Sequence, residues 1–488
     1  MPDLYQELIK LADSEMYPFH MPGHKRNEQS TPLKGAFRCD ITEIDGFDNL
    51  HSEEGIILEA EKRAAKLYGS GETFFLINGS TSGVLSAISA AVSFGGTILA
   101  GRGSHRSFYH AAYLRHLNIE YLPAKIMDKY GIFDGFSEED VENALKDTDK
   151  KVEAVFITSP TYEGRCSDVE GIAKVCHRRG IPLIVDAAHG AHFGFGDDIP
   201  ESAVHQGADI VINSVHKTLP AMTQTALIHV QGDIVDKCLL KRFLTIYQSS
   251  SPSYVLMSSI DLCIREMQDN GKQYTQALLK YRKMLQDAAD LFQNLLIPST
   301  LELQDPAKVL IYTGFTAMTG QKLYDILRED YSLQLEMAGE KYALAIITGW
   351  DTDEGIERLI KALKEIDEGY GLTPNSTERK SINRRVSEKS SSTKIQIPQK
   401  RLLLYEAWDL ESEIVPPEEC AGRIAGGFIN LYPPGIPLIV PGEVIDESLI
   451  KNIKRYEAEN LNVQGLENKK EENKGIIGKR GFLCVKQK

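Results

Sequence analysis

The chain has 488 residues, of which 42% are hydrophobic and 25% are charged. This length exceeds that of one ordinary domain and the composition is globular, so we expect about two or three domains with large cores. The formal net charge of -14 argues against a nucleic-acid-binding protein and fits an enzyme whose substrate is a cationic small molecule.

The cysteines and the N-terminus bear on the cell compartment. The seven cysteines are scattered and none forms a Cys-x-x-Cys pair, so neither a metal site nor a disulfide framework is predicted. The first residues, MPDLYQELIKLADSE, lack the basic start and apolar core of a signal peptide. A reducing cytoplasm is the simplest inference.

Residues 83–101, GVLSAISAAVSFGGTILAG, form an uncharged run that is long enough to resemble a transmembrane helix. Gly95 and Gly96 interrupt the run, and serines make its first half polar along one side. We therefore predict a buried helix followed by a short buried strand at 97–100, and no association with a membrane.

From about residue 53 to 260 the chain alternates between helix and strand patterns. Apolar residues at helical spacing predict a helix from Ile56 to about Gly69 and another at 168–179. Continuous apolar runs, typical of strands covered on both faces, predict strands at 73–77, 97–100, 153–158, 182–186, 209–213 and 225–230. This alternation indicates an α/β fold with a mostly parallel sheet.

The rest of the chain divides into distinct parts. Residues 254–295 have a helical pattern, 300–349 a smaller α+β pattern, and 353–367 the pattern of an amphipathic helix. Residues 372–400 are rich in Ser, Lys and Arg, which predicts a mobile linker or a surface segment held only locally. The predicted organisation is an N-terminal segment (1–52), a major domain (53–260), a helical connection with a small α+β domain (261–371), the linker (372–400) and a C-terminal domain (401–488).

A run of small and hydroxyl residues, NGSTSG at 78–83, separates the strand 73–77 from a helix expected to begin near residue 84. Such a junction leaves backbone N–H groups free to face an anion, and the helix dipole adds attraction. Ser80, Thr81 and Ser82 supply further donors. The alternative is an N-cap cluster without a ligand; the run has neither the Lys of a nucleotide P-loop nor the spacing of a dinucleotide fingerprint.

Asp186 ends the apolar run 182–186. A carboxylate at the carboxyl end of a buried parallel strand lies where α/β sheets bind ligands. The residues Ala-Ala-His-Gly follow Asp186. Taken alone, Asp186 is therefore explained equally well as the N-cap of a helix.

The strand 209–213 leads to Lys217, which follows Ser214 and His216 on a short polar turn. A pocket can lower the pKa of a lysine, whose neutral amine then forms a Schiff base with an aldehyde. A lone lysine is more often a solvated surface residue. His105 follows the strand 97–100, where an imidazole could stack on a flat ring, although a structural histidine is the more common case.

Together these features predict a site for pyridoxal 5'-phosphate (PLP). The loop 78–83 would hold the phosphate, His105 would stack on the ring, and Lys217 would bind the aldehyde. Asp186 would pair with the pyridine nitrogen and keep it protonated, which makes the ring an electron sink. Ser214 and His216 could hydrogen-bond the phosphate or a substrate carboxylate.

Longer motifs add a family resemblance. They are FHMPGHK at 19–25, DITEIDG at 40–46, DAAHGAH at 186–192, SVHK at 214–217, GRI at 422–424 and YPPGIP at 432–437. The order of phosphate loop, ring-stacking residue, Asp and Lys is that of the fold-type-I PLP enzymes. The motifs together resemble those of the bacterial ornithine/lysine/arginine decarboxylases, over nearly the whole chain except the linker.

The resemblance implies a fold-type-I PLP-dependent transferase fold, an α/β architecture whose mostly parallel sheet is sandwiched by helices. A small α+β domain and a C-terminal decarboxylase domain would follow. It assigns Lys217 to the Schiff base, Asp186 to the pyridinium and His105 to the ring stack. It places His189 or Ala188 near the 3-hydroxyl of the ring, and it assigns the phosphate to Ser80, Thr81, Ser82, Ser214 and His216.

The resemblance also implies an assembly, because fold-type-I sites usually form between two subunits. We expect a homodimer or a higher homo-oligomer. Since FHMPGHK begins at residue 19, the chain looks like the short form of the family, without the N-terminal wing domain of its large members.

The implied reaction is the PLP-dependent decarboxylation of arginine, lysine or ornithine to agmatine, cadaverine or putrescine, with release of CO2. Lys217 or His216 would return a proton to Cα. The distal cation of the substrate would need a carboxylate, for which Glu443, Asp45 and Asp48 are candidates. The segment AGGF at 425–428 lacks the acidic residue expected there, so it does not identify this group.

Two other functions stay open. An aminotransferase or a carbon–sulfur lyase would keep PLP, but no arginine can be assigned to the second carboxylate of a keto acid. A non-catalytic binding protein with the same fold would be expected to have a damaged cofactor site, and none of the main elements is missing from the sequence.

Overall fold

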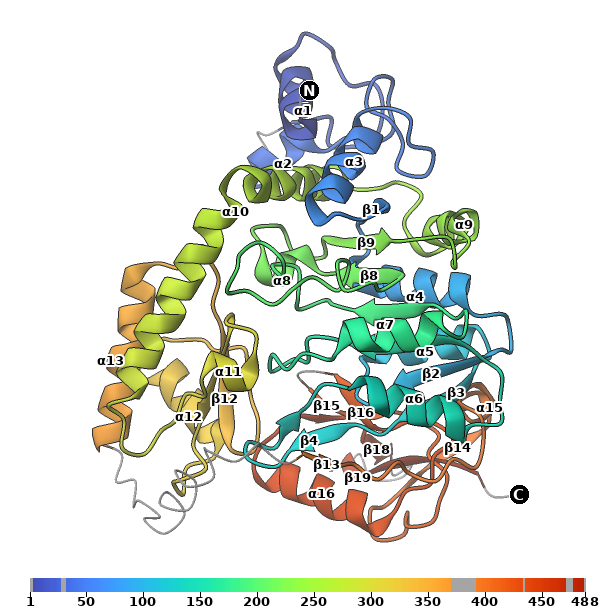
Figure 1. Ribbon diagram of the computed structural model, residues 1–488, viewed down its shortest axis with the longest axis vertical. Helices are drawn as coiled ribbons and strands as arrows, with labels where there is room; N and C mark the ends of the chain where they lie inside the picture. The colour runs from blue at the N-terminus through green and yellow to red at the C-terminus, as the bar shows by residue number, and fades with distance from the viewer. Residues whose placement is uncertain (1–2, 28–31, 370–391, 433–434, 471–476, 487–488) are drawn as a thin grey trace.

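The computed structural model describes residues 3–27, 32–369, 392–432, 435–470 and 477–486. A sheet covered by helices lies at the centre, between an N-terminal helical group and the C-terminal domain (Figure 1). The small domain lies beside them, joined to the N-terminal group by the long helix α10 (Tyr254–Ala289). None of the described helices combines the length and the apolar character needed to cross a membrane.

The central sheet has seven strands in the order β1-β9-β8-β7-β6-β2-β3. From β3 to β8 each neighbouring pair is parallel, whereas β9 runs antiparallel to both β8 and β1. The bounds are β1 Glu72–Leu76, β2 Thr97–Gly101, β3 Asn118–Leu122, β6 Val152–Thr158, β7 Leu183–Asp186, β8 Ile210–Asn213 and β9 Ala226–Val230.

This sheet confirms the predicted mostly parallel α/β fold, and every strand expected from a continuous apolar run is present. The edge strand β3 was not predicted. Its sequence, NIEYL, mixes buried with half-buried positions, so it lacks the continuous apolar run that predicted the other strands.

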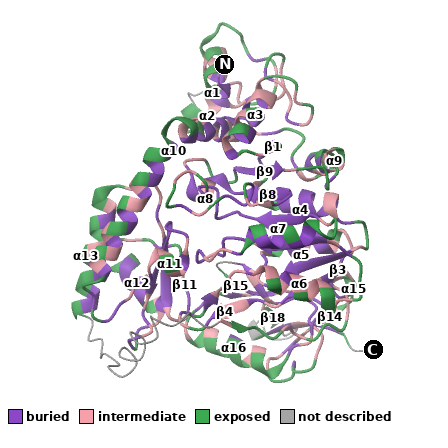
Figure 2. Cartoon of the chain, in the orientation of Figure 1, coloured by how far each residue is buried: buried purple, intermediate pink, exposed green. Residues whose placement is uncertain are grey.

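Helices cover both faces of the sheet, so the inner strands β2, β7, β8 and β9 are buried along their whole length and β6 along most of it (Figure 2). One set packs against Ala100, Phe156 and Ile184, and the other against the alternate residues Leu99 and Val155. The first set is α4 Gly79–Ala91, α5 Arg106–Leu114 and α9 Lys237–Tyr247, and the second is α6 Glu138–Asp147 and α7 Val169–His177. The segment 83–101 is thus a buried helix followed by a strand, as predicted.

The N-terminal group consists of α1 (Leu4–Asp13), α2 (Lys34–Cys39) and α3 (Ile56–Tyr68) with the first half of α10. These helices share one core that includes Leu4, Leu8, Ile57 and Tyr254. The apolar faces of these helices therefore hold the start of the chain against the antiparallel end of the sheet.

The small domain contains a three-stranded antiparallel sheet in the order β10-β12-β11. This matches the predicted α+β unit and the predicted amphipathic helix after it. The elements are α11 Thr300–Leu303, β10 Lys308–Tyr312, α12 Gly320–Glu329, β11 Met337–Ala338, β12 Tyr342–Ile346 and α13 Asp353–Gly369.

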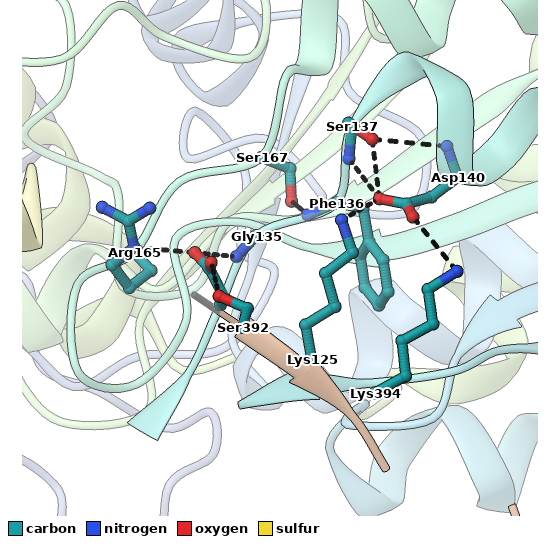
Figure 3. A network of polar contacts seen from close by, with 10 residues as sticks. Lys125, Gly135, Phe136, Ser137, Asp140, Arg165, Ser167, Ser392 and Lys394 are labelled. Carbon is teal, nitrogen blue, oxygen red and sulfur yellow. Dashed lines mark hydrogen bonds and ion pairs between the residues drawn. The ribbon is translucent and has the colours of Figure 1, made fainter. Parts of the chain in front are cut away.

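A second small sheet, in the order β13-β4-β5, joins β4 (Lys125–Met127) and β5 (Ile132–Phe133) to β13 (Ser392–Lys394). Most of the predicted linker, 372–391, lies outside the described residues. Its end, 392–400, is held in place: Ser392 donates to Asp134 at 2.6 Å and Lys400 donates to the carbonyl of Ile119 at 2.9 Å. Figure 3 shows β13 with Ser392 and Lys394 beside Lys125 and Arg165.

The C-terminal domain contains two antiparallel three-stranded sheets, β14-β19-β18 and β16-β15-β17. Leu404 and Val440 pack into the core of the major domain, which anchors one domain on the other. The elements are α15 Leu404–Asp409, β14 Ser412–Val415, β15 Ile429–Leu431, β16 Ile436–Ile439, α16 Glu447–Ala458, β17 Val463–Gln464, β18 Glu467–Lys470 and β19 Ile477–Val485.

Candidate active site

A cavity of about 310 Å³ lies where the carboxyl ends of the parallel strands face the small and C-terminal domains. Strand register explains why distant residues meet there. Thr158 at the end of β6 pairs with Asp186 at the end of β7, and Asp186 pairs with Ile212 of β8. Of the residues predicted from the sequence, the cavity is lined by Ser80, His105, Asp186, Ala188, His189 and Lys217.

Asp186 is buried at the end of β7, and its carboxylate accepts one hydrogen bond, from the N–H of Ala188 at 3.1 Å. Burial raises its pKa, while the nearby Lys217 acts in the opposite direction. No ion pair of Asp186 is formed within the described part of the chain. A buried carboxylate without a cation is costly, so this position suits a ligand that brings a positive charge.

Lys217 lies in the short helix α8 (Val215–Thr218), directly after β8. Its Nζ is 3.1 Å from Nε2 of His189. Burial lowers the pKa of Lys217, while Asp186 and Glu336 act to raise it. A lowered pKa increases the neutral, nucleophilic fraction of the amine.

His105 is the N-cap residue of α5, where its Nδ1 accepts the backbone N–H of Ser107 at 3.2 Å. Burial lowers the pKa of His105 to about 4, and the positive charges of Lys217 and Arg106 contribute. The ring is therefore neutral at pH 7. A neutral imidazole in a fixed orientation can lie against a cationic ring without charge repulsion.

The residues predicted for the phosphate lie in different surroundings. Helix α4 begins at Gly79 rather than near residue 84, so the NGSTSG run forms its first turn, and Asn78 makes no side-chain cap. Free N–H groups and the hydroxyl of Ser80 face the cavity there. Thr81 is exposed, and Ser82 donates to the carbonyl of Gly79 at 2.8 Å.

Ser214 and His216 flank Lys217 but do not line the cavity. The hydroxyl of Ser214 is fully buried and has no hydrogen-bond partner in the described structure. Nδ1 of His216 lies 2.7 Å from the carbonyl oxygen of Thr225, which points that nitrogen away from Lys217. An unsatisfied buried hydroxyl is unusual, so Ser214 fits a role toward a ligand, whereas the contact of His216 is internal.

The three acidic residues proposed for the substrate lie elsewhere in this chain. Glu443 is buried in an ion pair with Arg102 at 2.9 Å. Asp48 accepts backbone N–H groups at the start of α3, including those of Gly55 at 2.8 Å and Ile57 at 3.0 Å. Asp45 is exposed. The carboxylates of Glu443 and Asp48 therefore stabilise structure, and none of the three lines the cavity.

Sequence reasoning missed several polar residues at the cavity, among them Glu336, Tyr162 and Asp134. The hydroxyl of Tyr162 donates to Oε1 of Glu336. Tyr162 follows β6, so the rule that selected Asp186, a polar residue near the carboxyl end of a parallel strand, could have found it. Glu336 precedes β11 in the small domain, and no local pattern distinguishes it from other surface acids.

The arrangement fits PLP. The lowered pKa of Lys217 suits the aldehyde, the isolated carboxylate of Asp186 suits the ring nitrogen, and the neutral ring of His105 suits a stacked partner. Ser80 and the first turn of α4 suit the phosphate. The cavity thus offers groups that suit the aldehyde, the ring nitrogen, the ring face and, through Ser80, the phosphate of the cofactor.

Comparison with known proteins agrees with this geometry. The family model "Orn/Lys/Arg decarboxylase, major domain" matches residues 2–321, and that of the C-terminal domain of the same family matches residues 396–476. The chain belongs to the Orn/Lys/Arg decarboxylase family. It is therefore a PLP-dependent carboxy-lyase.

The chain is 29% identical to an arginine decarboxylase of Bacillus subtilis over 480 residues, which covers 95% of each protein. An uncharacterized Bacillus subtilis protein, YaaO, is 33% identical over 481 residues, again with 95% of each covered. Among solved structures, the lysine decarboxylase LdcF of Francisella novicida superposes with a TM-score of 0.80 at 19% identity, covering 100% of this chain and 81% of the other. That superposition confirms the fold-type-I architecture.

Proposed function

We propose that this protein decarboxylates arginine, releasing agmatine and CO2. The observation that carries the proposal is the carboxylate of Glu336, which faces the same cavity as Lys217. Among the described residues its side chain hydrogen-bonds to a tyrosine hydroxyl and forms no ion pair, which leaves it available for a cation. The relatives named arginine decarboxylase, which match over 95% of this chain, favour arginine over lysine and ornithine.

When PLP is bound, it supplies an electron sink for the electron pair left by the departing carboxylate. Lys217 would hold its aldehyde, Asp186 its ring nitrogen and His105 the face of its ring. Ser80 and the first turn of α4 would hold the phosphate. His189, whose Nε2 already contacts Lys217, would lie beside the 3-hydroxyl.

Glu336 would bind the guanidinium of arginine. A guanidinium offers paired N–H donors that match a carboxylate, and such charge-assisted bonds are strong. The hydroxyl of Tyr162 orients one carboxylate oxygen of Glu336 and leaves the other free for the ligand.

Asp134, another acid of the cavity wall, is less suited to this role. Asp134 is held by Arg165 at 2.8 Å, by the N–H of Gly135 at 2.8 Å and by Ser392 at 2.6 Å; Figure 3 labels Arg165, Gly135 and Ser392, which lie close together. The arginine already neutralises its charge, so Asp134 offers less attraction to a second cation.

The cavity wall also favours decarboxylation over transamination. No arginine occurs among the described residues that line the cavity, so a second carboxylate has no such partner there. The apolar side chains of Phe133, Phe136 and Ile436 contribute to the wall. Exclusion of water by such residues favours loss of a charged carboxylate. We infer that Lys217, rather than His216, returns the proton to Cα, because His216 does not line the cavity.

The experiment compares arginine, lysine and ornithine as substrates for the wild type, Glu336→Gln and Glu329→Gln. Glu329 is the matched control, because it lies in the same domain and pairs with Arg328 on the surface at 2.7 Å. Loss of one charge-assisted hydrogen bond is worth about 2 kcal/mol, so Glu336→Gln should lower kcat/KM for arginine roughly 30-fold. The control should retain wild-type kinetics.

Three results would contradict the proposal. One is a preference of the wild type for lysine or ornithine, one is equal kinetics of Glu336→Gln and wild type, and one is a keto-acid product without CO2. The last would support the aminotransferase alternative.

We also propose that the enzyme is a cytoplasmic homo-oligomer. Met16, Tyr17, Phe19 and Met21, in or next to the FHMPGHK motif, are 65–91% exposed in the single chain. Neighbouring apolar side chains of this size favour burial against a partner. Light scattering that gives the mass of a monomer would contradict the proposal.

A further inference from the structure

A hydrogen-bonded row of three side chains extends from the cavity into the protein. Nζ of Lys217 is 3.1 Å from Nε2 of His189, and Nδ1 of the same imidazole is 2.9 Å from Nζ of Lys308. Lys308 is the first residue of β10 in the small domain. The row therefore joins the major domain to the small domain through a single imidazole.

The far end of the row is sealed from solvent. Lys308 is 0% exposed and His189 is 7% exposed. Nζ of Lys308 also donates to the carbonyl of Tyr162 at 3.0 Å and lies 5.6 Å from the centre of its ring. Lys308 does not line the cavity, so it acts on a bound molecule only through another residue.

The hydrogen bonds restrict where protons can be. Burial is the largest of the causes that lower the pKa of His189 far below its usual value, so the ring is neutral. A neutral imidazole has one donor nitrogen and one acceptor nitrogen. If Lys308 donates to Nδ1, then Nε2 donates to Lys217, whose Nζ must offer a lone pair. If instead Lys217 donates to Nε2, then Nδ1 donates to Lys308, whose Nζ must offer the lone pair.

The hydrogen-bond acceptors around the row favour the proton on Lys308 and the lone pair on Lys217, and act against burial, which lowers the pKa of both lysines. Lys308 has a carbonyl, an aromatic face and His189 as acceptors, whereas among the described residues Lys217 hydrogen-bonds to His189 alone. Burial lowers the pKa of Lys308 to about 8. The charged or titratable groups that face the row are Asp186, Glu336, Asp305, Glu163, His105, His216 and Tyr162, and Asp305 pairs with His192 at 2.9 Å.

We propose that Lys308 is a positioning residue that stores a proton and exchanges it with Lys217 through His189. In one direction, Lys308 gives a proton to Nδ1 while Nε2 gives its proton to Lys217. One proton moves in total, and Lys308 is left as a neutral amine. The inference rests on the proposed role of Lys217 toward PLP.

The exchange serves two opposite needs of the reaction. Lys217 must be neutral to bind an aldehyde, and it must be protonated to return a proton to Cα. Decarboxylation consumes one proton for each CO2 released. This proton enters from solvent after the product leaves and passes along the row in the reverse direction.

The test uses PLP alone and needs no substrate. The rate at which apoenzyme captures PLP is followed by absorbance between pH 6 and 9. In Lys308→Met the buried positive charge next to Lys217 is lost, so the pKa of Lys217 rises. The pH profile of capture should shift upward by about one pH unit.

The matched control is Thr313→Val, because Thr313 is buried directly after β10 and its hydroxyl has no partner in the described structure. Its profile should equal that of the wild type. A Lys308→Met profile that matches the wild type would overturn the proposal. So would a rate that falls equally at every pH, because that result indicates a purely structural role.

A second variant, His189→Leu, covers the case in which Lys308→Met does not fold. In holoenzyme the absorbance change of the lysine-bound cofactor should move to higher pH, because a donor to its nitrogen is lost. If Lys308, whose pKa burial lowers to about 8, supplies the proton, kcat of the wild type should fall above about pH 8, and this fall should be absent in His189→Leu. If His189→Leu keeps both the absorbance change and the alkaline fall of kcat at the pH of the wild type, the proposed proton exchange is overturned. Shifts in PLP capture with an enzyme inactive on arginine would support the relay and reject the proposed substrate.

Discussion

Replacement of Glu443 with Ala tests how the C-terminal domain is fixed to the major domain. Oε2 of Glu443 accepts from Nη2 of Arg102 at 2.9 Å and from the N–H of Val440 at 3.0 Å. Arg102 follows β2 and also donates to the carbonyl of Pro437 at 2.8 Å. Both charged side chains are almost fully buried, at 1% and 5% exposure. The substitution leaves a buried guanidinium without its counter-charge.

The expected loss is large because the pair is buried. Removal of one partner of a buried ion pair costs about 3–5 kcal/mol, and loss of the Val440 hydrogen bond is worth about 1 kcal/mol. A matched surface pair lies in the same domain: Glu413 contacts Arg423 at 2.7 Å, and the glutamate side chain is 46% exposed. Replacement of Glu413 with Ala should cost about 0–1 kcal/mol.

The assay uses one of the two tryptophans of the chain. Trp408 on α15 packs against Tyr113 of α5 with ring centroids 4.8 Å apart, so its fluorescence reports whether the two domains are docked. Trp350 is 62% exposed, and a Trp350→Phe background removes its signal. In urea, Glu443→Ala should undock well before Glu413→Ala.

If the urea concentration at the midpoint of undocking is unchanged in Glu443→Ala, the ion pair with Arg102 does not hold the two domains together. If that variant instead showed a raised KM for arginine, Glu443 would contact the substrate, as the sequence suggested. The loss of stability in Glu443→Ala arises because Arg102 stays charged and buried without its partner. The double variant Arg102→Met/Glu443→Ala should therefore recover part of the lost stability.

Two further predictions concern catalysis and pH. Lys217→Ala should abolish both agmatine formation and the absorbance of bound PLP, whereas His216→Gln should retain the absorbance; turnover in Lys217→Ala would reject the role of that lysine. Burial lowers the pKa of His229 to about 3, so below pH 6.5 the unfolded chain binds a proton that the folded chain does not. Stability should therefore fall as the pH drops from 6.5 towards 3. In His229→Gln, the difference in Tm between pH 7.5 and pH 5.5 should shrink by about 2 °C; an unchanged difference would contradict the buried, neutral assignment.

The local sequence determined the strands, the helices and the chemistry at strand ends. Continuous apolar runs specify strands covered on both faces, and the carboxyl ends of parallel strands lie at one edge of a sheet. These two rules were sufficient to bring Asp186, Lys217 and His105 to one cavity. They failed for β3, whose mixed pattern is that of an edge strand.

Only the tertiary structure decided which charged side chains line the cavity. Glu443 and Glu336 are both single acids in the second half of the chain, and nothing in their neighbours separates them. The fold pairs Glu443 with Arg102 and aims Glu336 into the cavity. Lys308 is likewise an ordinary lysine at the start of a strand until the small domain brings it to His189. Such roles depend on long-range contacts and burial, which set the pKa and the partner of a side chain and leave no trace in local periodicity.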